Sequence, residues 1–509
     1  MLRRVLPAAN AIFLGHVMVR LGSLVLVPLF LRYWSPISYG EYLTLFAAVG
    51  YLASLDIGMQ WAAVNRLTQA YARNDLDEYR TVQHSSLFFY LLLSASVTVL
   101  VASLVWLFPI PHWIGLRMTK PTTATLVIIL LAGYVMWSMP MRLISAIYQT
   151  TGNLARSQWI ANAQQLLVVL LSALVLILGG GMLAIASLQI LTVGFISLFV
   201  LLDVRRRSPE LLPGIAEAKL SVLKELARPS LLFALLVVGN LIAYQGSTLL
   251  VSAALGGLSV AVLSVTKAMI DVVRQGLYSI NLALCPDFAR METLGELEKL
   301  RMVHRITVAA VAAVTLAVAA SAWYEGALII TVWTRGRIEP DVTLLRLFLI
   351  LMAFQTPWAA SSTVATATNR HKVQAIGYFF SAIVGIGLVA ALLPRLGPRA
   401  VPVGLTIGEA IGCYHFVIKA TCQIIGESYS AFALRFWSGF AAVSAAVLTA
   451  SWAIHHMMPG PMLVRWAVMG LFTVLLAAAC AWVVWLTPED RALLLPKFRT
   501  VFGVSEVKV

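Results

Sequence analysis

Long apolar stretches separated by short polar ones run along most of the chain. A helix needs about 20 apolar residues to cross the hydrocarbon core of a membrane. Fourteen stretches qualify, at about 9–33, 41–63, 84–109, 123–147, 157–179, 182–203, 229–254, 259–281, 304–326, 342–366, 373–393, 400–422, 433–455 and 463–486. The pattern predicts an all-α, polytopic membrane protein with about fourteen transmembrane helices, twelve being the alternative.

The composition agrees with this pattern. Of 509 residues, 60% are apolar and 12% charged, and the mean hydropathy is +0.87, outside the range of soluble domains. The net charge of +15 is expected of cytoplasmic loops beside anionic lipid, so nucleic acid is not an expected partner. The four cysteines form no CxxC pair, so neither a disulfide framework nor a metal site is predicted.

The basic residues are unevenly shared between alternate loops. With the N-terminus inside, the inner loops and termini hold about three times as many Lys and Arg residues as the outer loops, which predicts that both termini are cytoplasmic. The longest inner connection, 204–228, is rich in Lys and Arg and is typical of an amphipathic helix on the membrane surface.

The two halves of the chain carry similar motifs. Thr150-x-x-Asn153-x-x-Arg156-x-Gln158 follows the fourth predicted helix, and Thr366-x-x-Asn369-x-x-Lys372-x-Gln374 follows the tenth. An even number of helices per repeat makes the repeats parallel, related by an axis along the membrane normal. We predict a six-helix bundle at 1–203, an amphipathic linker at 204–228, a second six-helix bundle at 229–424, and two extra helices with a tail at 425–509.

A proline lies inside the helix that precedes each of these motifs, Pro140 in the first half and Pro357 in the second. Proline removes a backbone hydrogen bond and kinks a helix. We predict that both residues act as hinges, and a static kink filled by packing is the alternative.

Three charged residues interrupt the predicted helix 259–281. Lys267, Asp271 and Arg274 lie at i, i+4 and i+7 and share one helix face. Each charge near the bilayer centre costs roughly 2.5–3.5 kcal/mol. This face is therefore predicted to meet protein or a water-filled cavity, and an internal ion cluster that only joins helices is the alternative.

Other predicted helices also carry polar residues. His16 with Arg20, Asp56 with Gln60, and Asn240 with Tyr244 are i, i+4 pairs, and Arg142 and Glu409 stand alone. If the two halves face each other, a cationic central cavity results, which suits an anionic cargo, and the planar Arg fork suits phosphate. The candidate cargo-binding residues are Arg20, Arg142, Lys267 and Arg274; those for ion coupling or charge balance are Asp56, Asp271 and Glu409; those for polar lining are His16, Gln60, Asn240 and Tyr244.

Simpler roles exist for several of these residues. Arg142 could instead extend its side chain to the inner membrane interface, where its charge meets water. His16 could instead be a hydrogen-bonded packing residue. The sequence lacks a phosphate-binding glycine loop and the common hydrolase motifs. We therefore predict a transporter without a cofactor, and not an enzyme.

The motifs Tyr39-Gly40-Glu41-Tyr42, Leu55-Asp56-Ile57-Gly58, Asn65-Arg66 and Thr151-Gly152-Asn153 resemble those of the Wzx-like polysaccharide flippase family. This family translocates O-antigen and exopolysaccharide precursors and belongs to the superfamily that includes MATE exporters and the lipid II flippase. The resemblance is best over 1–160. It implies a bacterial inner-membrane protein that flips a polyprenyl-pyrophosphate-linked oligosaccharide outward by alternating access around a cationic cavity.

The expected partners are thus the bilayer, the lipid-linked saccharide and other polysaccharide assembly proteins. One alternative is a MATE-like, ion-coupled exporter of small cationic compounds. MATE exporters usually carry an acid in the first or seventh helix, and neither predicted helix has one here. A membrane-bound polymerase or ligase is the other alternative, but the longest outer connection, about 107–123, is short for an active site.

Overall fold

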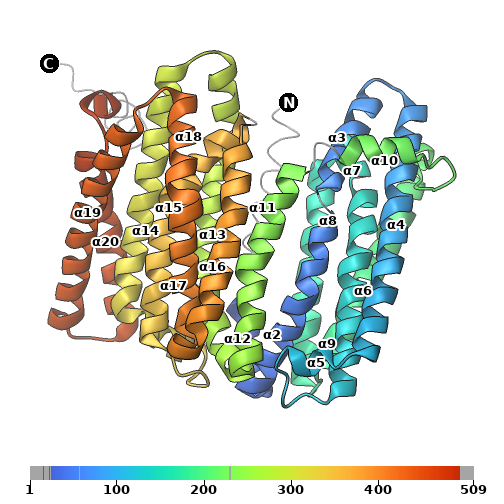
Figure 1. The fold of residues 1–509 in the computed structure, drawn as a ribbon, viewed down its shortest axis with the longest axis horizontal. Helices are drawn as coiled ribbons and strands as arrows, with labels where there is room; N and C mark the ends of the chain where they lie inside the picture. The colour runs from blue at the N-terminus through green and yellow to red at the C-terminus, as the bar shows by residue number, and fades with distance from the viewer. Residues whose placement is uncertain are drawn as a thin grey trace. The chain divides into compact units, whose positions relative to one another are not determined.

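The computed structural model describes residues 15, 22, 24–56, 58–227, 231–368 and 370–492. All regular secondary structure within these ranges is helical (Figure 1), which confirms the all-α prediction. Ten helices in these ranges are long and apolar enough to cross a membrane. The finer count of fourteen and the orientation stay predictions, and Asn369 of the second motif lies outside the described residues.

A short apolar helix covers Leu24–Tyr33. The labelled helices that follow it in chain order are α2 (Pro36–Gly50), α3 (Met59–Ala72), α4 (Leu76–Leu107), α5 (Ile110–Trp113), α6 (Pro121–Ser145), α7 (Ile147–Thr150), α8 (Leu154–Ile177), α9 (Met182–Arg207), α10 (Leu220–Ala227), α11 (Leu231–Leu241), α12 (Ser247–Leu255), α13 (Gly257–Thr293), α14 (Leu297–Trp333), α15 (Val342–Ala367), α16 (Lys372–Leu396), α17 (Ala400–Glu409), α18 (His415–Ile425), α19 (Tyr429–Met457) and α20 (Met462–Val484). Short 3-10 helices include η1 (Tyr51–Asp56), and π-helical turns join α11 to α12 (Ile242–Gly246) and α17 to α18 (Ala410–Tyr414).

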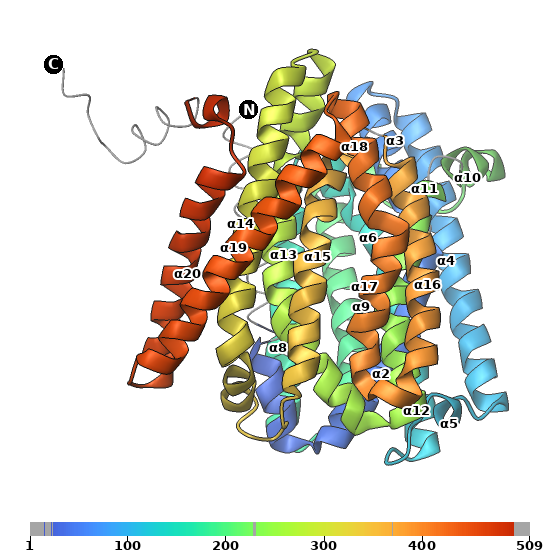
Figure 2. The same ribbon diagram turned by 60° about the vertical axis from the view of Figure 1, so that its left-hand side comes forward.

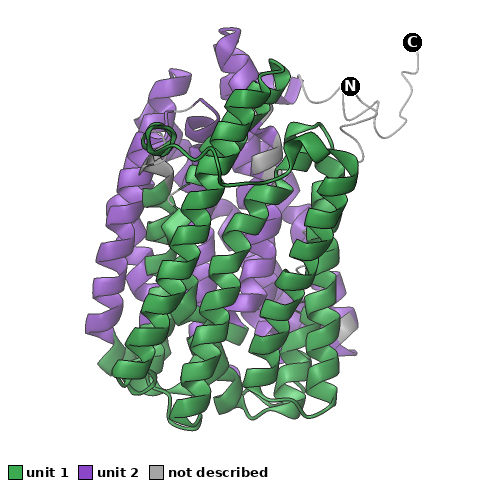
Figure 3. Cartoon of the chain, turned by 90° about the vertical axis from the view of Figure 1, so that its right-hand side faces the viewer, with its two compact units in different colours: residues 1–265, 333–339, 393–398 green, residues 266–332, 340–392, 399–509 purple. Residues whose placement is uncertain are grey.

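The chain forms two compact units, coloured separately in Figure 3. Unit 1 comprises Met1–Val265, Trp333–Glu339 and Leu393–Pro398, and unit 2 comprises Thr266–Val332, Pro340–Leu392 and Arg399–Val509. In unit 2, α19 and α20 lie side by side (Figure 2), and the Ser321 and Thr473 hydroxyls link α14 to α20 at 3.0 Å. The predicted boundaries at 203, 228 and 424 and the two-fold repeat stay predictions.

The predicted helix 41–63 is broken in the structure. The chain passes from α2 into η1, and α3 begins after Gly58, whose φ of 74° lies in the left-handed region that glycine favours. Irregular backbone at membrane depth is tolerated where it lines a cavity or is buried in protein. The break therefore makes this part of unit 1 a candidate for a ligand-binding site.

Two predicted helices, 373–393 and 400–422, form a hairpin whose arms are α16 and α17–α18. Glycines bring the two arms together: a Cβ atom added at Gly377 would lie 2.5 Å from the Gly412 carbonyl oxygen, and one at Gly408 would lie 2.5 Å from the Ser381 carbonyl oxygen. Small residues at an interface let helix backbones approach closely, as in many membrane helix pairs.

Glu41 fixes one end of unit 1. Its carboxylate is fully buried and accepts hydrogen bonds from the backbone N–H groups of Arg117, Met118 and Thr119 at 2.7–2.8 Å, and from the Thr119 hydroxyl at 2.5 Å. We call this arrangement the Glu41 clasp. A buried carboxylate is costly unless such donors surround it, so the clasp ties α2 firmly to the loop before α6.

Gly40, next to Glu41, allows α2 to touch the start of α13. A Cβ atom at Gly40 would lie 1.7 Å from the Gly257 carbonyl oxygen. Close by, the Thr44 hydroxyl donates to the Ser252 hydroxyl at 2.9 Å, and the Tyr42 hydroxyl accepts from the Gln189 amide at 2.8 Å. The motif Tyr39-Gly40-Glu41-Tyr42, one of those that carry the family resemblance, thus lies where several helices pack closely together.

Replacing Gly40 with alanine should force the two backbones apart. We expect Gly40→Ala to lower the free energy of unfolding by about 1–3 kcal/mol, as overpacking does, measured as a lower unfolding temperature in detergent. Gly194→Ala is the matched control: Gly194 lies inside α9 with nothing within 4 Å of its added Cβ, and alanine is the better helix former there. Equal unfolding temperatures for Gly40→Ala and wild type would contradict the close contact.

Candidate functional site

Unit 1 contains a cavity of about 660 Å³. Residues from η1, α3, α6, α7, α8 and α9 line it, so it lies inside a ring of helices. Its polar lining residues are Asp56, Gln60, Tyr134, Ser138, Arg142, Ser145, Gln149, Ser157, Gln158, Gln164, Gln165 and Ser197. Three residues predicted from sequence, Asp56, Gln60 and Arg142, meet in this one cavity. Its volume lies within the roughly 300–1,000 Å³ typical of ligand pockets.

Asp56 is presented to the cavity by the helix break. It is the last residue of η1 and lies just before Gly58. Its carboxylate accepts a hydrogen bond from the hydroxyl of Tyr90 on α4, a fully buried side chain. The Tyr90 hydroxyl therefore uses part of the hydrogen-bonding capacity of the Asp56 carboxylate. This hydrogen bond holds the carboxylate against the wall of the cavity.

Arg142 brings the positive charge to the cavity. It lies in the last turn of α6, and its side chain is exposed. The side chains of Tyr90 and Tyr134 lie close enough to interact electrostatically with its guanidinium group. Within the described part of the chain, no carboxylate forms an ion pair with Arg142. Its guanidinium can therefore offer its five N–H donors to an anion in the cavity.

Pro140 lies two residues before Arg142, and α6 continues through it. Proline has no N–H to give to the carbonyl four residues earlier, which here is that of Met136. The Ser94 hydroxyl on α4 donates to this oxygen at 2.7 Å. Pro357 is likewise buried inside an uninterrupted helix, α15. The hinge role of both prolines stays a prediction.

Removing the Ser94 hydroxyl should leave the Met136 carbonyl without its side-chain partner. We expect Ser94→Ala to destabilise the protein by about 1–3 kcal/mol, the cost of a buried unsatisfied polar group, seen as a lower unfolding temperature. Ser451→Ala serves as the control, because Ser451 is fully buried and its hydroxyl bonds to none of the described residues. Equal effects of the two substitutions would count against this role for Ser94.

The sequence reasoning missed most of the amides in the cavity. Gln149, Gln164 and Gln165 were given no role, and Gln158 entered only as part of a repeated motif. The available signal was the adjacent pair Gln164-Gln165 within an otherwise apolar stretch. Polar residues inside a membrane helix are costly and often functional.

In unit 2, the three charged residues of α13 form a short row. Arg274 Nη2 lies 2.9 Å from Asp271 Oδ1, and Lys267 also interacts electrostatically with Asp271. The side chains of Asp271 and Arg274 are about one quarter exposed. The acid is therefore shared between the two cations, and the roles predicted for all three residues stay predictions.

Glu409, the isolated acid of the sequence, has partners in unit 2. It is 5% exposed and accepts hydrogen bonds from the Gln355 amide and, at 3.0 Å, from the Trp358 indole N–H, both on α15. Arg274 acts on it electrostatically. Since the partners lie more than fifty positions away in the sequence, sequence spacing gives no sign of them.

The remaining predicted residues are placed as follows. His16 and Arg20 lie outside the described residues. Asn240 on α11 is exposed, and Tyr244 in the following π-helical turn is partly buried. Neither is among the residues that line the unit 1 cavity.

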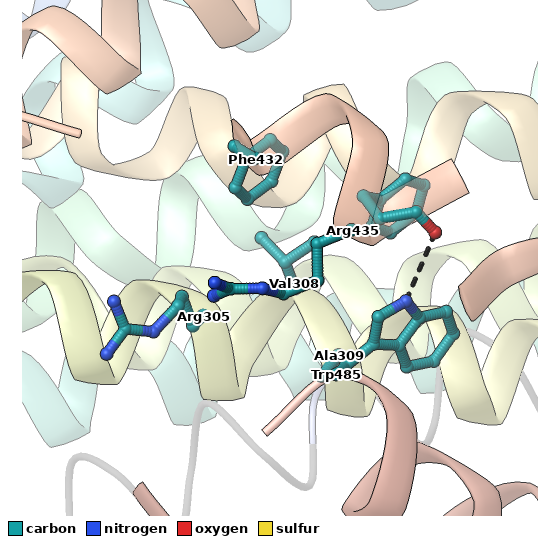
Figure 4. Close-up of a pocket in the computed structure, with 7 residues that line it drawn as sticks. Arg305, Val308, Ala309, Phe432, Arg435 and Trp485 are labelled. Carbon is teal, nitrogen blue, oxygen red and sulfur yellow. Dashed lines mark hydrogen bonds between the residues drawn. The ribbon is translucent and has the colours of Figure 1, made fainter. Parts of the chain in front are cut away.

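Unit 2 also has a small cavity, of about 20 Å³, lined by Arg305, Arg435 and aromatic side chains (Figure 4). It has room for little more than one water molecule. Arg305 binds Asp490 through Nη2 and Oδ1 at 2.9 Å, and the Trp485 indole donates to the Phe436 carbonyl at 3.1 Å. We assign this cavity to packing between α14, α19 and the segment after α20.

Asp490 gives this ion pair a dependence on pH. Burial alone would raise the pKa of Asp490, but hydrogen bonds from Arg305 and the Thr487 N–H hold it below its usual range. A carboxyl whose pKa is lower in the folded than in the unfolded state adds stability above its ordinary pKa. That stability is lost as the pH falls through the folded-state pKa.

We therefore expect Asp490→Asn to lower the free energy of unfolding by about 2 kcal/mol near pH 7, typical of hydrogen bonds to charged groups. The difference from wild type should shrink as the pH falls below about 4, the ordinary pKa of aspartate. Unfolding temperatures from pH 7 downward measure it. Glu489→Gln, at an exposed neighbour, should match wild type throughout. A difference that stays constant with pH would refute the account.

The long apolar helices of the described residues are those of a multi-pass membrane protein. Its fold is similar to the solved structures of a multidrug resistance MATE family transporter of the MOP superfamily and of the lipid II flippase MurJ. No protein family and no curated protein matches the chain by sequence.

Three similar structures show the extent of the likeness. The lipid II flippase MurJ in its inward closed conformation has a TM-score of 0.70 and 10% identity, over 93% of this chain and 98% of that chain. An inward-facing multidrug resistance MATE transporter has a TM-score of 0.69 and 16% identity, over 80% and 94%. An outward-facing MATE transporter has a TM-score of 0.59 and 17% identity, over 82% and 96%. At these identities the likeness is one of fold.

Proposed function

We propose that the protein is a flippase of the Wzx-like family in a bacterial inner membrane. It turns a polyprenyl-pyrophosphate-linked oligosaccharide from the inner to the outer leaflet by alternating access, for assembly of O-antigen or exopolysaccharide. The likeness of its fold to that of a lipid II flippase over 93% of the chain supports a lipid-linked cargo. Its partners are the bilayer, this cargo and other polysaccharide assembly proteins.

The observation that carries the proposal is the charge arrangement in the unit 1 cavity. Arg142 and Asp56 are its two charged lining residues. Asp56 is bound by Tyr90, whereas Arg142 has no ion-pair partner among the described residues. An anionic headgroup can therefore use the guanidinium. The planar fork of arginine donates two parallel hydrogen bonds to phosphate oxygens and keeps its charge at all working pH values.

The other predicted residues have roles consistent with this cargo. Lys267 and Arg274 on α13 supply further positive charge, and Arg20 is the fourth cation in the proposal. Asp271 and Glu409 balance charge or couple transport to an ion, and the membrane potential is an alternative driving force for a charged complex.

A second candidate function is the export of small cationic compounds by a MATE-like mechanism. Asp56, an acid that lines a large cavity, is the observation that favours it. For such a cargo Asp56 would be the binding group and Arg142 would be repulsive. The two functions therefore predict opposite effects of removing Arg142.

We expect Arg142→Ala to slow flipping of a polyprenyl-pyrophosphate-linked disaccharide about 10- to 100-fold, because hydrogen bonds to charged groups contribute about 1.5–3 kcal/mol. The assay uses proteoliposomes loaded with a fluorescent analogue, and the fraction protected from an external quencher reports flipping. Arg142→Lys should recover part of the rate, since lysine keeps the charge but lacks the fork.

Arg206→Ala, at an exposed arginine of α9, controls for loss of a positive charge elsewhere. Unchanged flipping in Arg142→Ala would remove the proposed role. Failure of the wild-type protein to flip the lipid, together with faster ethidium efflux from Arg142→Ala liposomes, would favour the cation exporter.

A further inference from the structure

We propose that the glutamine side chains of the unit 1 cavity bind the carbohydrate part of the cargo, as uncharged sugars rich in hydroxyl and N-acetyl groups. This inference rests on the proposed function and adds to it a site for the glycan. The five glutamines, which we call the amide wall, are Gln60 on α3, Gln149 on α7, and Gln158, Gln164 and Gln165 on α8.

Helix α8 contributes most of the amide wall. Gln158, Ala161 and Gln165 are spaced at i, i+3 and i+7, and Ser157 and Gln164 at i and i+7. Residues at these spacings share a helix face, and all five of these α8 residues line the cavity. This face of α8 is polar although the helix as a whole is apolar enough to span a membrane.

The amides of the wall make no hydrogen bond to any other described residue. Elsewhere in unit 1, buried amides do bond to protein: the Gln189 amide donates to the Tyr42 hydroxyl at 2.8 Å, and the Gln83 amide donates to the Leu211 carbonyl at 3.2 Å. Asn162, on α8 between these glutamines, is buried, and its Oδ1 lies 2.2 Å from where a Cβ on Gly15 would stand. The chain thus uses its buried amides for packing, whereas those of the wall face the cavity.

A side-chain amide offers two N–H donors and one carbonyl acceptor without carrying a charge. A sugar hydroxyl also both donates and accepts, and an N-acetyl group carries an amide of its own. A set of amides therefore satisfies a sugar ring in many orientations. A cationic drug would instead need carboxylates or aromatic faces, and the cavity offers one of each, Asp56 and Tyr134.

The part of the cavity lined by α9, a helix that packs against α8, suits the apolar faces of sugar rings. Val193, Ile196 and Val200 of α9 lie at i, i+3 and i+7, and all three line the cavity. Tyr134 on α6 adds one aromatic ring. Sugar rings carry C–H groups on their faces and hydroxyls around their edges. The apolar residues of α9 therefore suit the ring faces, and the amide wall suits the hydroxyls. Arg142 in the same cavity places the pyrophosphate beside the first sugars.

The test compares two lipids, polyprenyl pyrophosphate without sugar and the same lipid carrying an N-acetylglucosamine-containing disaccharide. Affinities are measured with the full-length protein in nanodiscs. We expect Gln164→Leu/Gln165→Leu to weaken binding of the sugar-bearing lipid about tenfold, the loss of one to two net hydrogen bonds, with binding of the sugar-free lipid unchanged. Arg142→Ala should weaken binding of both lipids.

Gln69→Leu, at an exposed glutamine of α3 outside the cavity, is the matched control. If the double variant does not fold, as judged by size-exclusion chromatography, the single variant Gln158→Leu replaces it. Equal losses for both lipids, no loss for either, or equal wild-type affinity for the two lipids would overturn the inference. Wild-type protein that binds neither lipid would instead show that the proposed function is wrong.

Discussion

The high cost of leaving charged and main-chain polar groups unpaired in apolar surroundings shapes this protein. Hydrocarbon offers no hydrogen bonds, so a bare carbonyl or carboxylate costs several kcal/mol there. The structure avoids this cost by pairing elements far apart in the sequence. Loop amides surround Glu41, the Ser94 hydroxyl satisfies the carbonyl that Pro140 leaves free, and α15 supplies two donors to Glu409.

The five glutamines and Arg142 of the unit 1 cavity are not paired in this way with any described residue. These side chains are held on helices that are otherwise well packed, and they face a space large enough for a ligand. The broken helix that carries Asp56 opens onto the same space. Under the proposed function, the protein has to provide for a sugar-phosphate headgroup the hydrogen-bond partners that water provides outside the bilayer. The cavity has the size and the chemistry to do so.

The sequence was sufficient to predict the class of fold, because helical membrane spans are encoded locally as long apolar runs. Asp56, Gln60 and Arg142, which line the unit 1 cavity, were also visible in the sequence, since polar residues stand out in such runs; their roles stay predictions. The sequence did not predict the break at 51–58, because isolated residues such as Asp56 and Gly58 also occur within continuous membrane helices. Tertiary pairs such as Tyr90 with Asp56, or Gln355 with Glu409, depend on how helices pack, and no local pattern encodes that. The glutamines of α8 and the spacing that puts them on one helix face were visible in the sequence, but the cavity that this face lines was not.

The geometry of the Glu41 clasp has a consequence for which residues position 41 can accept. Three consecutive backbone amides converge on the two oxygens of one side chain, so a small shift of the loop would stretch all of these bonds together. Aspartate is one methylene too short to reach, and glutamine replaces one acceptor oxygen with a donor that would oppose an N–H group. The position is thus intolerant even of its nearest chemical neighbours, although Glu41 is not among the residues that line the unit 1 cavity.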